Sequence, residues 1–148
     1  MERNLMFELK QLELLGKAYR PKNPVFKRNL NFTQVHILIF LFTHEDEDIC
    51  QKDLEIETGL KKASITGTLN SLEDKGYIIR EVSSDDKRRN HIVLTEKSLN
   101  IKKHIQEGFY EFNQIALKGF DDEDRKELFR LIDMVENNLK GGMSEADF

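Results

Sequence analysis

Residues 49–95 read ICQKDLEIETGLKKASITGTLNSLEDKGYIIREVSSDDKRRNHIVLT. The opening piece, ICQKDLEIET, favours a short helix, and Gly59 directly after it is the residue type that most often ends a helix. A second helix is expected to follow at once, because apolar residues recur at helical spacing from Ile65 to Leu72 and Gly76 stands where that helix would end. Two short helices joined by a tight turn containing glycine are typical of a helix-turn-helix.

Two strand patterns follow the second helix. Residues 77–81 (YIIRE) and 91–95 (HIVLT) are rich in β-branched and aromatic side chains. The intervening residues, VSSDDKRRN, are polar and form turns readily. The pattern predicts a β-hairpin whose tip carries three cations, Lys87, Arg88 and Arg89.

Helical patterns flank this segment on both sides. Residues 3–19 repeat leucine at helical spacing, which predicts an amphipathic helix. After two prolines, Thr33 can cap a nearly all-apolar helix, as expected of a helix buried on several sides. Residues 98–117 and 122–139 predict two long amphipathic helices behind the hairpin.

The composition predicts one helix-rich domain. The chain has 148 residues, 39% of them hydrophobic, with only 2 prolines and 8 glycines. Its single cysteine, Cys50, excludes an intramolecular disulfide and fits a reducing compartment. The N-terminus alternates apolar and charged residues, unlike a signal peptide or a membrane span, so we expect a cytoplasmic protein.

The charge is unevenly distributed along the chain. The formal net charge is −4 and the pI about 5.6, which argues against nonspecific coating of nucleic acid. Residues 60–90, however, carry seven basic and five acidic side chains. From Asp121 onward the chain carries four basic and nine acidic side chains. The pattern indicates that only the middle of the chain faces phosphate.

The middle segment resembles the MarR family of transcription regulators. The similar pieces are the run from Gly59-Leu60 to Tyr77-Ile78, then Asp86-Lys87-Arg88, then Leu94-Thr95-Glu96-Lys97, which is similar to the family's D-x-R…LTEK wing signature. The resemblance spans essentially the whole chain. It implies a mainly α fold with a small β-hairpin wing, a winged helix-turn-helix, in which the N- and C-terminal helices form a dimerisation region.

The resemblance also implies that different segments of one domain, residues 1–148, have different roles. Residues 1–30 and 98–140 would supply dimerisation helices, residues 31–97 the DNA-binding lobe, and residues 141–148 a frayed tail. The implied function is a ligand-responsive repressor that binds a pseudo-palindromic operator on double-stranded DNA as a homodimer. A small aromatic or phenolic effector would bind between the dimerisation helices and the lobe.

The second helix of the helix-turn-helix supplies the candidate DNA contacts, because the major groove admits a helix whose N-terminal half reaches base edges. Small residues would let the helix sit deep, and an asparagine can pair with an adenine edge. The cations of the hairpin would track phosphates or enter a narrow minor groove. By resemblance, Arg88 enters the minor groove and Asp86 holds it in place. The candidates on the helix are Lys61, Lys62, Ala63, Ser64, Thr66, Gly67 and Asn70.

Other functions receive less support from the sequence. No nucleophile motif, phosphate-binding loop or dinucleotide-binding turn occurs, so we expect no enzymatic activity and no cofactor. Cys50 could sense oxidants, but its acidic surroundings favour a structural role. The histidines could bind a metal, yet none has the spacing of a zinc motif, so we expect no metal site; they are His36, His44, His91 and His104. The alternative function is a protein-interaction module or antirepressor that has lost DNA binding.

Overall fold

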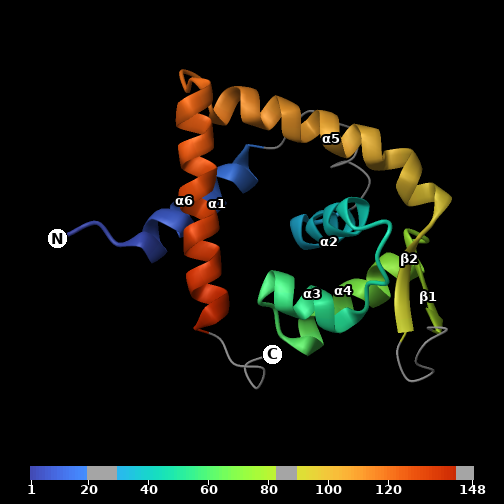
Figure 1. The fold of residues 1–148 in the computed structure, drawn as a ribbon. Helices are drawn as coiled ribbons and strands as arrows, with labels where there is room; N and C mark the ends of the chain where they lie inside the picture. Colours follow the sequence, from blue (N-terminus) through green and yellow to red (C-terminus); the bar gives the residue numbers. More distant parts are fainter. Residues whose placement is uncertain (20–29, 83–89, 143–148) are drawn as a thin grey trace.

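The computed structural model describes residues 1–19, 30–82 and 90–142. Over these ranges the elements follow the expected order, a helix, a core helix, a helix-turn-helix, a hairpin and two long helices. The helix-turn-helix and hairpin lie together on one side of the molecule, α5 (Glu96–Ala116) crosses above them, and α6 (Asp122–Gly141) runs down beside them (Figure 1). The elements are α1 (Leu5–Ala18), α2 (Phe32–Thr43), α3 (Gln51–Thr58), α4 (Lys62–Asp74), β1 (Ile78–Val82), β2 (Asn90–Leu94), α5 (Glu96–Ala116) and α6 (Asp122–Gly141).

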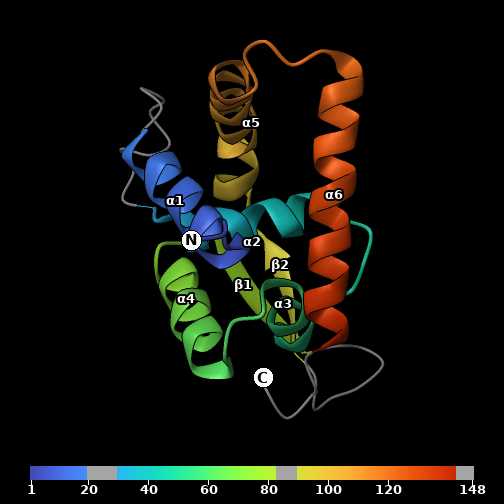
Figure 2. The ribbon, with the colours of Figure 1, turned by 90° about the vertical axis from the view of Figure 1, so that its left-hand side faces the viewer.

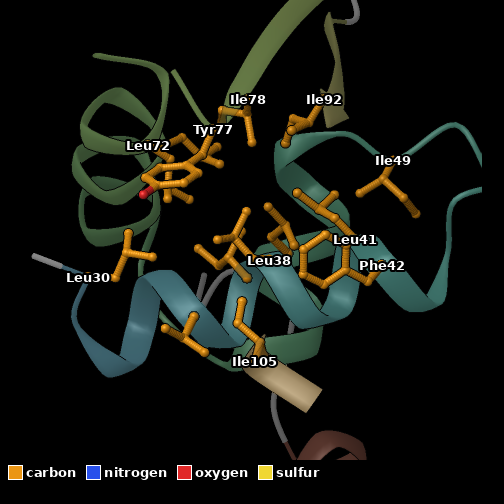
Figure 3. Close-up of a cluster of buried hydrophobic side chains, with 14 of the residues drawn as sticks. Leu30, Leu38, Leu41, Phe42, Ile49, Leu72, Tyr77, Ile78, Ile92 and Ile105 are labelled. Carbon is orange, nitrogen blue, oxygen red and sulfur yellow. The ribbon is translucent and has the colours of Figure 1, made fainter. Parts of the chain in front are cut away.

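One apolar core joins α2, the helix-turn-helix, the hairpin and the first half of α5 (Figure 3). Ile37 and Leu38 of α2 are fully buried at its centre. The apolar stripe of α4 packs on this helix, and Ile105 contacts it from α5. Burial of these aliphatic side chains contributes most to holding α2, α4, the hairpin and α5 together in one lobe.

The start of α2 differs from the prediction. The N-cap is Asn31, whose side-chain oxygen accepts a hydrogen bond from the Gln34 backbone N–H at 2.9 Å. The Gln34 side chain accepts one in return from the Asn31 N–H, also at 2.9 Å. This reciprocal capping box satisfies two backbone donors at once. The prediction that Thr33 caps the helix is therefore wrong, and Thr33 lies inside the first turn.

The turn between α3 and α4 confirms the predicted role of Gly59. This residue has φ 67°, in the left-handed region where a Cβ would be strained, and its N–H donates to the Glu55 carbonyl at 2.9 Å. Gly76, after α4, also has a positive φ of 80° and turns the chain into β1. The two glycines therefore set the angles at which α4 leaves α3 and enters the hairpin.

The hairpin is anchored to the start of α3. Strands β1 and β2 pair antiparallel, with Ile78 opposite Leu94, so each is displaced by one residue from its predicted range. The Ile92 N–H also donates to the Ile49 carbonyl at 2.8 Å, which attaches β2 to the segment before α3. The predicted cationic tip, with Asp86, Lys87, Arg88 and Arg89, lies outside the described residues.

Helix α5 is fastened at its start to the end of α4. Thr95 caps α5, and its hydroxyl donates to the Gly76 carbonyl at 2.6 Å. Lys97 donates to the Lys75 carbonyl at 2.5 Å and lies over the Tyr77 ring. These contacts give the LTEK piece a structural role that spacing alone did not indicate.

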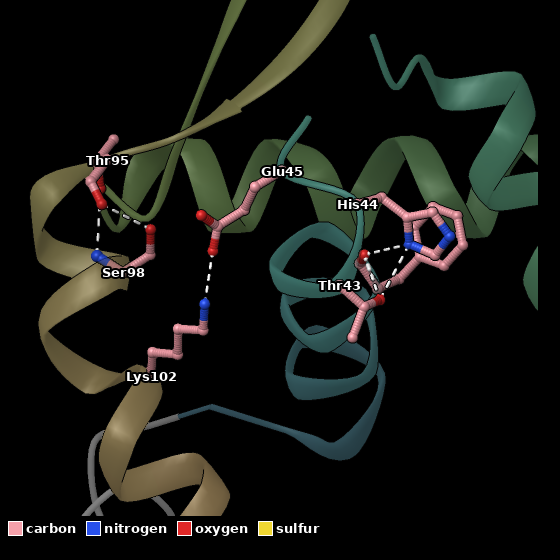
Figure 4. A network of polar contacts seen from close by, with 7 residues as sticks. Thr43, His44, Glu45, Thr95, Ser98 and Lys102 are labelled. Carbon is pink, nitrogen blue, oxygen red and sulfur yellow. Dashed lines mark hydrogen bonds and ion pairs between the residues drawn. The ribbon is translucent and has the colours of Figure 1, made fainter. Parts of the chain in front are cut away.

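A second attachment of α5 lies one turn further along (Figure 4). Lys102 makes a 2.7 Å ion pair with Glu45, in the turn after α2. Ser98 is fully buried, and its hydroxyl donates to the Thr95 carbonyl at 2.8 Å. The first turns of α5 are therefore integral to the lobe.

The terminal helices contrast with the lobe. Neither α1 nor α6 has a buried residue, although both carry large apolar side chains. The C-terminal end of α6 reaches α3, where Lys140 forms a 3.2 Å ion pair with Glu57 (Figure 2). Such a surface pair contributes little, about 0–1 kcal/mol. Among the described helices, none combines the length and apolar character needed to cross a membrane.

Candidate nucleic-acid interface

Helix α4 has one buried side and one exposed side. Ile65, Leu69 and Leu72 are fully buried and hold the helix against the core. With a helical period of 3.6 residues, Ala63 and Gly67 lie on the opposite side. Of the seven residues predicted to contact DNA from this segment, only Thr66 is half-buried; the exposed ones are Lys61, Lys62, Ala63, Ser64, Gly67 and Asn70.

Thr66 faces the protein rather than solvent alone. Its hydroxyl donates to the Lys62 carbonyl and accepts a hydrogen bond from the Gln51 side chain, both at 2.8 Å. The hydroxyl therefore holds α3 against α4. Sequence reasoning did not identify Gln51, because a glutamine at the start of a helix gives no indication of its partner on the next helix.

A second polar contact holds the C-terminal end of α4 in place. Gln34 is 3% exposed, and its side-chain amide donates to the Ser71 hydroxyl at 2.8 Å. A buried amide needs such a partner, since an unsatisfied one is costly. The glutamine of the α2 capping box thus also sets the position of α4. The Asn31-x-x-Gln34 spacing could have predicted the cap, but not this contact.

The C-terminal half of α4 is linked to the hairpin by Arg80 of β1. The Arg80 guanidinium donates to the Asn70 side-chain oxygen, and its Nε atom lies 3.3 Å from a carboxylate oxygen of Glu73. The sequence analysis treated Arg80 only as one charge within a basic window. The structure instead makes it the direct partner of a predicted DNA-contacting residue.

Replacing Gly67 with alanine is expected to raise the free energy of unfolding by about 1 kcal/mol, because glycine in a helix interior loses more conformational freedom on folding than alanine. A Cβ atom at Gly67 would meet nothing within 4 Å. Urea denaturation at fixed protein concentration measures the change. The matched control is Gly76→Ala, where φ is 80° and the substitution should destabilise instead. Equal shifts in both variants would contradict this explanation.

The described cysteine and histidine side chains do not come together in one site. Cys50 is a buried free thiol at the N-cap of α3, 8% exposed. His44 stacks on Phe40 with 4.0 Å between ring centroids, and His91 lies between carboxylates of Asp48 and Glu81 at 3.4 and 3.2 Å. Within the part of the chain that the structure describes, no three His, Cys, Asp or Glu side chains are grouped as metal ligands.

An apolar pocket of about 600 Å³ lies between α1, α5 and the lobe. Its charged border is a pair on α1, in which Lys17 donates to Glu13 at 2.5 Å. Hydrogen bonds from Lys17 and Lys10 lower the pKa of Glu13 to about 2. An anion entering the pocket would thus compete with Glu13 for Lys17. The lining includes Gly16, Lys17, Phe32, His36, Ile39 and Phe109.

These elements define a winged helix-turn-helix protein, with α4 as its exposed second helix and β1–β2 as its wing. Residues 28–89 match the sequence model of the MarR family. A MarR transcriptional regulator from Methanosarcina mazei Go1 has 25% identity and a TM-score of 0.78, covering 92% of this chain and 96% of its own. The chain is therefore similar to the MarR family over α2 to β1 and shares the fold of a solved MarR regulator over most of its length.

Two solved structures with the same fold contain DNA. A MarR-family transcriptional regulator from Listeria monocytogenes complexed with 26mer DNA is 21% identical, with a TM-score of 0.83, covering 95% of this chain and 92% of its own. The S. aureus MepR–DNA complex is 18% identical, with a TM-score of 0.78, covering 92% of this chain and 96% of its own. At these identities the likeness establishes the fold.

Proposed function

We propose that this protein is a MarR-family regulator that binds double-stranded DNA as a homodimer and represses transcription by blocking promoter access. The observation that carries the proposal is the exposed side of α4, which presents small and polar residues with Lys61 and Lys62 at its N-terminal end. A helix N-terminus with added cations attracts phosphate, and small residues allow close approach to base edges. Two structures of similar fold contain DNA, which supports DNA binding by this chain.

The homodimer is proposed from the apolar surface of the terminal helices. Leu12 of α1 is 66% exposed, and Ile132 and Leu139 of α6 are 39% and 59% exposed. Exposed apolar surface of this extent marks an interaction site. A second copy of residues 1–30 and 98–140 would cover it, while residues 31–97 of each copy enter successive major grooves of a pseudo-palindromic site.

The hairpin tip completes the proposed DNA contacts. Lys87, Arg88 and Arg89 would follow phosphates or enter the minor groove beside each recognition helix, with Asp86 holding Arg88. Together with the exposed residues of α4, they would make a contact that combines groove reading and phosphate binding.

The pocket beside α1 is the proposed effector site. Its apolar lining and bordering Lys17 suit a small aromatic or phenolic anion. Binding there would favour a dimer conformation in which the two lobes no longer span both half-sites, a shift in population rather than a local block. No catalytic step is part of this function.

Selection of bound sequences from a random duplex library tests the proposal. An enriched inverted repeat, bound at salt concentrations where phosphate-only binding fades, is the expected result. Failure to enrich any sequence, with a dimer still present in solution, would overturn DNA binding and favour an interaction module. The same library then supplies the duplex for the variants below.

Replacing Arg88 with alanine is expected to weaken binding to the selected duplex by roughly tenfold to a hundredfold, because one groove contact is worth about 1–3 kcal/mol. Fluorescence anisotropy with a labelled duplex measures the affinity. Cys50→Ser is the control and should leave binding almost unchanged, since Cys50 is buried and is not one of the proposed contacts. Equal binding by Arg88→Ala and the unaltered protein would exclude the wing contact.

A further inference from the structure

The contact between Arg80 and Asn70 bears directly on how α4 reads a base. Asn70 is exposed on α4, and Arg80 comes from the neighbouring strand β1. The Arg80 side chain is only 24% exposed and is also paired with Glu73. It is therefore held from two sides, with its guanidinium directed at the Asn70 oxygen.

This arrangement fixes which end of the Asn70 amide faces outward. A guanidinium has only donors, so it can pair with the amide oxygen but not with the amide nitrogen. If the Asn70 amide were rotated by about 180°, its Nδ2 donors would face the N–H donors of the Arg80 guanidinium, and no hydrogen bond could form. The Asn70 Oδ1 atom is thus directed at Arg80, and the Nδ2 donors remain for another partner.

The orientation of the amide matters because adenine and guanine present different hydrogen-bonding groups to an asparagine. Pairing with adenine uses both ends of the amide, with Oδ1 accepting from the N6 amino group and Nδ2 donating to N7. Guanine offers only acceptors, N7 and O6, at the same edge. A guanidinium at Oδ1 uses one of the two lone pairs of that oxygen and places positive charge where the adenine amino group would approach.

We infer that Arg80 is a positioning residue that determines the base specificity of Asn70, making it a donor that favours guanine in place of the adenine pairing expected from the sequence alone. The inference rests on the proposed function, since it requires α4 to lie in the major groove. It adds a determinant from β1, outside the recognition helix, to the reading of one base pair in each half-site.

The experiment compares selected sequences from a random duplex library for four proteins, the unaltered chain, Asn70→Ala, Arg80→Met and the double variant. Asn70→Ala identifies the base position that Asn70 reads, because the preference there disappears. The unaltered protein is expected to prefer guanine at that position. Arg80→Met, which keeps the aliphatic stem but no donor, should change the guanine-to-adenine ratio of binding by about tenfold in favour of adenine. The double variant should show neither preference.

Two controls separate positioning from general charge or stability effects. Arg80→Lys retains a donor for Oδ1 and should keep the guanine preference. Glu73→Gln removes the ion pair but leaves the Arg80–Asn70 contact, and should also keep it. Thermal unfolding of each variant checks that the lobe remains folded, and the base ratio, unlike total affinity, does not depend on the folded fraction.

The possible failures are distinguishable. If the unaltered protein prefers adenine at the Asn70-dependent position, the inference is overturned while DNA binding stands. If Arg80→Met weakens binding to all sequences equally with a shallower salt dependence, Arg80 is a phosphate contact, and the inference is again overturned while DNA binding stands. If no protein enriches any sequence, the proposed function itself fails.

Discussion

Replacing Ile132 with glutamate is expected to separate the proposed homodimer into monomers and to weaken binding to a duplex with two half-sites by a factor on the order of 10²–10⁴. Ile132 is 39% exposed on α6, on the helical face that also carries Leu128, Val135 and Leu139. A charge at the centre of an apolar interface would have to be buried without a partner. Sedimentation equilibrium measures the oligomeric state, and anisotropy with the selected duplex measures the affinity.

The control places the same charge on the other side of α6. Asn137 lies opposite Ile132 by helical position and is exposed. Asn137→Glu should remain dimeric and keep its affinity. A duplex with a single half-site should bind the Ile132→Glu monomer and the unaltered protein with similar affinity per lobe. A fully dimeric Ile132→Glu variant would place the interface elsewhere.

Replacing Ile65 with alanine is expected to lower the free energy of unfolding by about 2–5 kcal/mol, because it removes buried methyl groups and leaves a cavity. Ile65 is fully buried on the inner side of α4. Urea denaturation at one fixed protein concentration measures the loss, since the stability of a dimer depends on concentration. The change is large beside the usual 5–15 kcal/mol stability of a native protein.

Ile56 on α3 provides the matched control for that substitution. It is the same residue type in the neighbouring helix of the same lobe, but 45% exposed. Ile56→Ala should cost much less, on the order of 0.5–1 kcal/mol. Similar losses at both positions would mean that α4 is not anchored through its apolar stripe.

The fold was predictable where local signals agree. Helix α4 was expected from apolar spacing and its flanking glycines, and the structure places Gly59 and Gly76 at positive φ at its two ends. The start of α2 was mispredicted because Asn31 and Thr33 are both good capping residues. Only Asn31 has a glutamine three residues later, at Gln34, to complete the capping box.

The candidate site was predictable only in part. Helical periodicity is sufficient to identify the exposed side of α4. The contacts that orient its side chains depend on tertiary neighbours, and the sequence separations are 37 residues for Gln34–Ser71, 15 for Gln51–Thr66 and 10 for Asn70–Arg80. No propensity or spacing rule links these pairs. Whether the Asn70 side chain is available to donate or to accept a hydrogen bond on the exposed side of α4 therefore depends on the folded lobe.

The attachment of Thr95 and Lys97 to the turn after α4 makes α5 a lever arm. Because the start of α5 is hydrogen-bonded to the turn after α4, we expect the two helices to move together. Helix α5 has 21 residues, so at 1.5 Å per residue it is about 31 Å long. A tilt of about 5° at its far end would displace α4 by roughly 3 Å, enough to break a hydrogen bond to a base. Small rearrangements among the terminal helices would thus be felt at the proposed DNA contacts.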